Sequence, residues 1–70
     1  MNPTFNEGDI LIHKDWKSLY LLSEIDYKKR LYYIVPISHE PRNIFWKDRT
    51  NEKGHAITYA EGISYFELGA

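Results

Sequence analysis

The amino-acid sequence predicts an all-β domain, a small barrel of five to six short antiparallel strands with one 3₁₀-like turn. Its 70 residues suffice for a single core and one domain, residues 1–70. Short segments rich in β-branched and aromatic residues alternate with turn residues at the roughly 8–12-residue spacing typical of sandwiches and barrels. A closed sheet also removes exposed strand edges, which favours a barrel.

The first half of the chain predicts three strands. A Gly-Asp turn at Gly8 precedes a β-branched segment at residues 10–13, the first strand. Residues 18–25 and 31–37 are two extended segments on either side of the polar stretch 26–30. We therefore expect a hairpin with a basic tip and no helix longer than about two turns.

The third strand carries a proline that fixes its end. Pro36 has no amide hydrogen to donate to a sheet, so it belongs at a strand end or an edge. Alternation then places Tyr32 and Tyr33 on opposite faces, and at least one of them should face solvent or pack under a loop. We assign Ile12 and Val35 to the core.

The second half predicts the remaining strands. Residues 42–47 form a fourth strand, and 48–54 form a polar turn. Residues 55–59 return as the fifth strand, and 60–63 make a tight or 3₁₀-like turn. Residues 64–68 give a last short strand that pairs with the first.

Composition bounds the cellular context. The absence of cysteine rules out disulfides and cysteine zinc sites and fits a reducing cytoplasm. The N-terminus has no basic and apolar leader, and no apolar run reaches the roughly 20 residues of a membrane span. We therefore expect a cytoplasmic protein without a membrane partner.

No pattern in the chain is typical of a catalytic, metal or cofactor site. His13, His39 and His55 lie in separate segments without metal-ligand spacing. Ser38 and Glu40 flank His39, but neighbours on an extended chain point to opposite faces, whereas a triad must converge. The glycines are too scattered for a phosphate loop. We expect no enzyme, no metal, no cofactor and no small-molecule substrate.

Aromatic and basic residues together are the most informative group. Aromatic residues make up 16% of the chain, more than one small core is expected to hide. Exposed Tyr, Trp and Arg are enriched at protein interfaces and also bind single-stranded nucleic acids. We expect the functional surface to centre on Trp46 and Tyr32; the alternative is that these rings complete the core. The candidate binding residues are Trp16, Lys28, Lys29, Arg30, Tyr32, Trp46, Lys47 and Arg49.

The start of the chain resembles a known fold family. Phe5, Gly8, Asp9, Leu11 and His13, followed by an aromatic-rich hairpin, resemble the first strands of SH3-like and Tudor-like barrels. They are more distantly similar to the CarD-type RNA-polymerase-interaction module, although that module has glycines where this chain has residues 14–18. The resemblance covers about half of the chain and implies an SH3-like fold.

Two functions remain open. The first is a non-enzymatic protein-binding module that presents its aromatic and basic surface to an acidic or mixed patch of a larger partner. A chain of this size and kind suggests a phage-encoded or accessory protein that modulates a host protein. The second is a small barrel that binds RNA or single-stranded nucleic acid through the tip at residues 28–30 and the segment 46–49.

Overall fold

The computed structural model describes residues 3–42, 44 and 46–69. The strands in these residues are β1 (Ile10–His13), β2 (Leu19–Asp26), β3 (Leu31–Pro36), β4 (Thr50–Asn51), β5 (Gly54–Thr58) and β6 (Phe66–Leu68). The helical elements are the 3₁₀ helix η1 (Lys47–Arg49) and the α-helix α1 (Tyr59–Tyr65). Strands dominate and α1 is only about two turns long, so the predicted all-β class is confirmed for this part of the chain.

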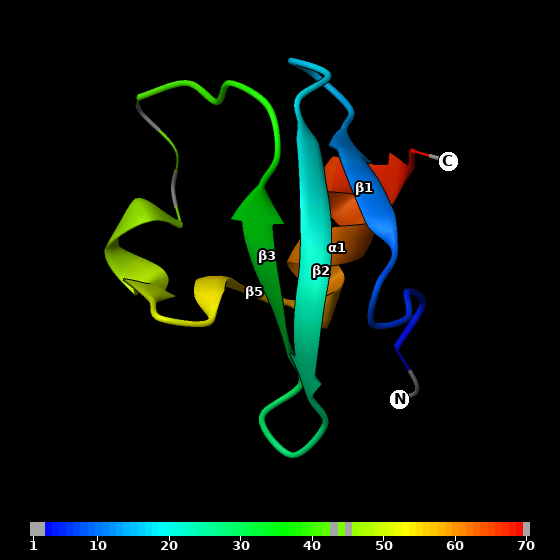
Figure 1. Cartoon of the computed structure of the whole chain (residues 1–70). Helices are drawn as coiled ribbons and strands as arrows, with labels where there is room; N and C mark the ends of the chain where they lie inside the picture. The colour runs from blue at the N-terminus through cyan, green and yellow to red at the C-terminus, as the bar shows by residue number, and fades with distance from the viewer. Residues whose placement is uncertain (1–2, 43, 45, 70) are drawn as a thin grey trace.

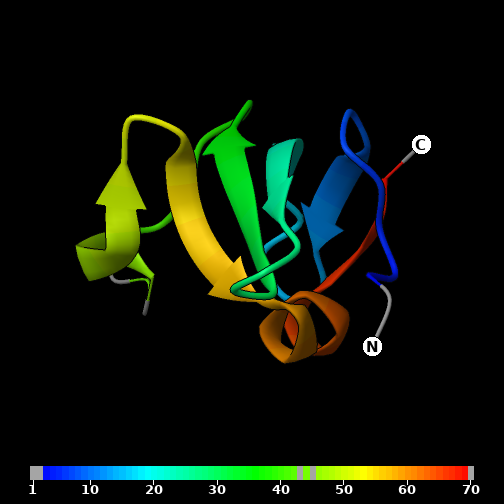
Figure 2. The same ribbon diagram turned by 90° about the horizontal axis from the view of Figure 1, so that it is seen from below.

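All six strands form one antiparallel sheet in the order β4-β5-β3-β2-β1-β6. Figure 1 shows β1, β2 and β3 side by side with α1 behind them, and Figure 2 shows the strands in a row above α1. The last strand pairs with the first, as predicted. The sheet is nevertheless open, because β4 and β6 are its two edges.

The predicted hairpin is formed by β2 and β3, and a bulge keeps its apolar residues on one face. The register shifts between Leu22 and Glu24, so Leu22 faces Ile34 across the strands and Ile25 faces Tyr32. The extra residue of a bulge preserves the facing of the residues on either side of it. In a regular strand of the same sequence, without the bulge, Leu22 and Ile25 would lie on opposite faces because they are three residues apart, and Ile25 would point away from the core.

The face of the sheet that packs against α1, here called the inner face, carries the core. Trp46 is fully buried at its centre, with the rings of Tyr20 and Phe66 at centroid distances of 6.0 and 5.5 Å. Such edge-on and tilted contacts are favoured between aromatic rings. The core cluster consists of Phe5, Leu11, Tyr20, Leu22, Ile25, Tyr32, Ile34, Ile44, Trp46, Ile57, Tyr59 and Phe66.

Helix α1 replaces the tight or 3₁₀-like turn that we predicted at residues 60–63 and the first two residues of the strand that we predicted at 64–68. Thr58 Oγ1 accepts a hydrogen bond from the Glu61 amide, and Glu61 Oε1 accepts one from the Thr58 amide, which forms a capping box. Gly62 is a buried residue of α1, and a Cβ at this position would lie 2.6 Å from the Tyr32 ring. The absent side chain lets the helix lie directly on the sheet.

The predicted fourth strand at residues 42–47 is wrong for the residues that the structure describes; Asn43 and Phe45 lie outside them. Trp46 occupies a turn that leads into η1. Local hydrogen bonds close this turn, from the Lys47 amide to the Ile44 carbonyl and from the Arg49 amide to the Trp46 carbonyl. The chain turns here because the indole enters the core, and the sheet instead gains the two-residue β4.

The predicted core positions Ile12 and Val35 are also wrong. Ile12 is half-buried and Val35 is exposed, and both lie on the opposite, outer face of the sheet. Their neighbours Leu11 and Ile34 are the ones that point into the core. Successive strand residues alternate between faces, so an assignment displaced by one residue reverses every side chain.

Candidate interaction surfaces

Trp46 and Tyr32 are core residues, so our expectation that they are exposed is wrong. Both have no exposed surface. Tyr32 lies under α1, and its hydroxyl accepts hydrogen bonds from the amides of Thr4 and Phe5 at 2.9 and 3.3 Å. The alternative, that aromatic rings complete a small core, holds for both residues, because both belong to the core cluster.

Trp16 covers one end of the core. Its ring is stacked on His13 with a centroid distance of 3.4 Å and an interplanar angle of 7°. His13, the last residue of β1, is itself buried, and its Nδ1 accepts the amide hydrogen of Asp15. Trp16 is half-buried, so only part of its ring can face a partner.

The basic candidates occupy two separate places. Lys28, Lys29 and Arg30 are exposed in the β2–β3 turn, as predicted for a hairpin tip. Lys47 and Arg49 lie in η1, and the Arg49 guanidinium makes two 3.1 Å contacts with the Glu61 carboxylate. Burial alone would raise the pKa of Glu61, but the hydrogen bonds from Arg49 and Thr58 outweigh burial and lower it. The basic residues therefore form no common surface with Trp46 and Tyr32, because the rings of these two residues are buried.

The outer face carries a cluster of aliphatic side chains that we call the outer aliphatic patch. Its cross-strand pairs are Ile10 with Leu21, Leu21 with Val35, and Ile12 with Leu19. Ile37 extends the patch, because its amide donates to the Leu19 carbonyl and continues the pairing of β3 with β2. The exposed fractions of Val35 and Ile37 are 38% and 54%. Figure 1 looks onto this face, and no segment passes in front of it.

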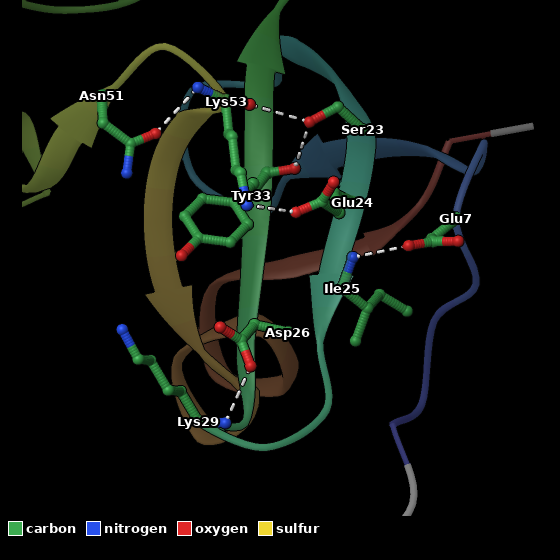
Figure 3. Close-up of polar contacts among 9 residues, drawn as sticks. All are labelled: Glu7, Ser23, Glu24, Ile25, Asp26, Lys29, Tyr33, Asn51 and Lys53. Atoms are coloured by element: carbon green, nitrogen blue, oxygen red, sulfur yellow. Dashed lines mark hydrogen bonds and ion pairs between the residues drawn. The ribbon is translucent and has the colours of Figure 1, made fainter.

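Polar contacts surround Tyr33 on another part of the outer face (Figure 3). Lys53 Nζ lies 2.8 Å from Glu24 Oε2 and 5.5 Å above the Tyr33 ring. The hydrogen bond and charge of Glu24 raise the pKa of Lys53. Ser23 Oγ lies 3.1 and 2.8 Å from the carbonyl oxygens of Tyr33 and Lys53 and ties β2 to the β4–β5 turn. We expected at least one of Tyr32 and Tyr33 to face solvent or pack under a loop, and Tyr33 packs under the β4–β5 turn.

A second polar network lies at the edge of the core. Glu40 accepts a hydrogen bond from the Tyr20 hydroxyl at 2.8 Å, and its other carboxylate oxygen lies 3.0 Å from His55 Nε2. The second ring nitrogen of His55, Nδ1, is hydrogen-bonded to Thr50 Oγ1. Burial, together with the hydrogen bond to Glu40, raises the pKa of Tyr20. The sequence neighbours Ser38 and His39 are exposed and do not join this network. The network anchors the segment around Glu40 to the sheet.

The described residues contain no cluster of three His, Asp or Glu side chains that could hold a metal ion. In the same part of the chain, no helix has the length and apolar character needed to cross a membrane. Comparison with protein-family models, with curated proteins and with solved structures found no match.

Sequence reasoning missed the outer aliphatic patch, although the chain carries a signal for it. Residues 10–12 and 19–22 have apolar side chains at consecutive positions. A strand with one solvated face alternates apolar and polar residues, whereas a consecutive apolar run makes both faces apolar. This signal places an apolar surface on the outer face without indicating what binds it.

Proposed function

We propose that this protein is a non-enzymatic protein-binding module that docks a partner through the outer aliphatic patch. The observation that carries the proposal is a row of aliphatic side chains on a sheet face that no described segment covers. The solvent face of an antiparallel sheet is ordinarily polar. Contiguous exposed apolar surface on a small protein marks an interaction site.

The chemistry of the patch favours an apolar protein surface as its partner. All six side chains are hydrocarbon, and a nucleic acid would instead require lysine or arginine beside its phosphates. The charged groups next to the patch are Glu67, which faces Ile12 across the strands, and Glu24, which is paired with Lys53. An aliphatic centre with a charged border is the usual anatomy of a protein interface.

We also propose that the sheet is an open relative of the SH3-like barrel and that the module works in the cytoplasm. Two features support the first proposal: β6 pairs with β1, so that the last strand lies beside the first, and the bulge in β2 bends its strand. Phe5, Leu11 and His13, three residues of the resembling motif, are buried in the core region. The lack of cysteine supports a reducing compartment.

A quantitative pull-down tests the proposed function. The tagged protein is incubated with nuclease-treated lysate beside the double variant Val35→Ser/Ile37→Ser, which makes the exposed part of the patch polar. The matched control is Ile63→Ser, which removes an equally exposed aliphatic side chain from α1. Circular dichroism confirms that all three proteins are folded.

We expect a captured protein whose recovery falls at least about tenfold with the double variant, because loss of a contact worth 1.4 kcal/mol changes affinity tenfold. Recovery with Ile63→Ser should match the unaltered protein. Equal recovery with all three proteins would contradict docking at the patch.

A further inference from the structure

A cavity lies between the β2–β3 turn and the first residues of α1. It has a volume of about 260 Å³ and is lined by Lys29, Arg30, Thr58, Tyr59 and Ala60. The Tyr59 amide donates to the Arg30 carbonyl at 3.3 Å, and the Lys29 amide donates to Asp26 Oδ1 at 2.9 Å. Hydrogen bonds thus fix both the turn and its distance from α1.

The turn has a positive charge that the surrounding residues do not neutralise. The side chains of Lys28, Lys29 and Arg30 make no hydrogen bond or ion pair within the part of the chain that the structure describes. Two acidic groups are near: Glu61 is held by Arg49, and Asp26, whose Oδ1 accepts the Lys29 amide, offsets only one of the three positive charges. The three cations are available to an anionic ligand.

Two tyrosines accompany these cations. Tyr27, in the same turn, is 63% exposed, more than any other large apolar or aromatic side chain of the described residues. Tyr59 lines the cavity, and its buried hydroxyl makes no hydrogen bond to a described residue. An exposed ring, a small cavity and three cations therefore occur together in the β2–β3 turn and at the start of α1.

We propose that this turn and cavity, Tyr27 to Arg30 with Tyr59, bind single-stranded nucleic acid. Lysine and arginine neutralise phosphates, and tyrosine rings stack on bases without regard to sequence. One base stacks on Tyr27, the phosphates of neighbouring nucleotides contact Lys28, Lys29 and Arg30, and a second base or sugar enters the cavity against Tyr59. A purely acidic segment such as polyglutamate would use the cations alone, because it has no group that stacks on the exposed ring or fills the cavity. The site lies at the opposite end of the β2–β3 hairpin from Leu19 and Ile37 of the outer aliphatic patch.

Fluorescence anisotropy with a short labelled oligothymidylate tests this proposal. Affinity should fall log-linearly with salt, with a slope near −2 for three phosphate contacts at about 0.7 each. The decisive variant is Arg30→Gly. Arg30 has a φ of +58°, a conformation that glycine adopts without strain, so this variant keeps the fold. We expect binding about tenfold weaker and a salt slope smaller in magnitude by about 0.7.

The chain provides a matched control at the other end of β2. Lys17 is also a cation with positive φ, +62°, in the β1–β2 turn, so Lys17→Gly removes the same charge and the same strain. It should bind the oligonucleotide within about twofold of the unaltered protein. Tyr27→Ala should weaken binding at least about fivefold and leave the salt slope unchanged, because stacking releases no counterions.

Three results would overturn the proposal: no binding of the oligonucleotide at low salt, equal losses for Arg30→Gly and Lys17→Gly, or equally tight binding of a polyglutamate peptide that is unaffected by Tyr27→Ala. The double variant Val35→Ser/Ile37→Ser separates this proposal from the proposed function. It should bind the oligonucleotide normally even if it loses its protein partner.

Discussion

The inner and outer faces of the sheet are built from alternate residues of the same strands, yet they differ in chemistry and exposure. On β3, Ile34 is completely buried, while the next residue, Val35, is 38% exposed. The inner face is a continuous cluster of aromatic and aliphatic side chains under α1 and the segment around Trp46. The outer face divides into an aliphatic end and a charged end, where Lys53 spans Tyr33 to reach Glu24.

This difference separates stability from interaction. Aromatic rings that could bind a ligand, such as that of Trp46, are instead buried on the inner face, because a small domain needs to bury their apolar surface in order to fold. The side chains left at the surface are aliphatic at one end of the β2–β3 hairpin and basic at the other. Variants of the inner face should therefore change folding, and variants of the outer face should change binding.

The largest effect should come from Trp46→Ala. Trp46 is fully buried among the rings of His13, Tyr20 and Phe66. Removal of a buried tryptophan side chain costs about 3–5 kcal/mol, which is most of the stability of a small domain. Urea unfolding followed by circular dichroism measures the loss. A midpoint close to that of the unaltered protein would place the indole outside the core.

The neighbouring residues of β3 give the sharpest contrast between the faces. We expect Ile34→Ala to lower the free energy of unfolding by about 2–4 kcal/mol, because its side chain is fully buried. Val35→Ala should lower it by less than about 1 kcal/mol, because its side chain is already partly in water. Matched urea titrations of the two variants measure both values. Equal losses, or the reverse order, would mean that the strand register is displaced by one residue.

Gly62→Ala tests the contact between α1 and the inner face. In an isolated helix alanine is more favourable than glycine by about 1 kcal/mol. Here the new methyl group would lie 2.6 Å from the Tyr32 ring, so we expect overpacking to outweigh propensity and to destabilise the fold by about 1–3 kcal/mol. Thermal unfolding measures the sign. Ala60→Gly, at an exposed position of the same helix, is the control for propensity alone.

The smallest effect is a pH dependence that arises from the inner face. Burial lowers the pKa of His13 from its ordinary 6.5, and Asp15 partly offsets this shift. The unfolded chain therefore takes up a proton that the folded chain does not, and stability falls as the pH drops below about 6.5. One proton changes the free energy of unfolding by at most about 1.4 kcal/mol per pH unit.

Urea midpoints measured from about pH 7.5 to about pH 5, a range that includes the ordinary histidine pKa of 6.5, measure this dependence of stability on pH. His13→Gln should remove it within this window. Glu61, whose pKa is lowered, contributes only as the pH falls below about 4.5 and does not interfere. An unchanged slope in the variant would assign the dependence to another group.

Most strands could be predicted from the sequence because their signals are local. Residues 10–13 form a strand as predicted, and Pro36 ends β3 where its missing amide hydrogen requires an end. Helix α1 was missed even though Thr58 and Glu61 have the spacing of a capping box. The segment around Trp46 was misassigned because its conformation depends on where the indole is buried, which is a property of the whole core.

The candidate site was predicted only in its basic part. Charges on a hairpin tip are exposed wherever the hairpin packs, so the exposure of Lys28, Lys29 and Arg30 followed from the turn signal alone. The facing of Tyr32 depends on the register of β2 with β3 and on the bulge at Ser23, and no local pattern indicates that bulge. The orientation of Trp46, which lies in a turn, depends on the packing of the whole core. The outer aliphatic patch required knowing which face of the sheet remains uncovered.

The pairing of the first strand with the last has a mechanical consequence. Leu11 faces Leu68 and His13 faces Phe66, so β1 begins beside the end of β6. A force applied through the two ends of the chain therefore loads these antiparallel strands at one end, and their hydrogen bonds break one after another instead of together. Pulled in this way, the domain should open at low force from the β6 edge.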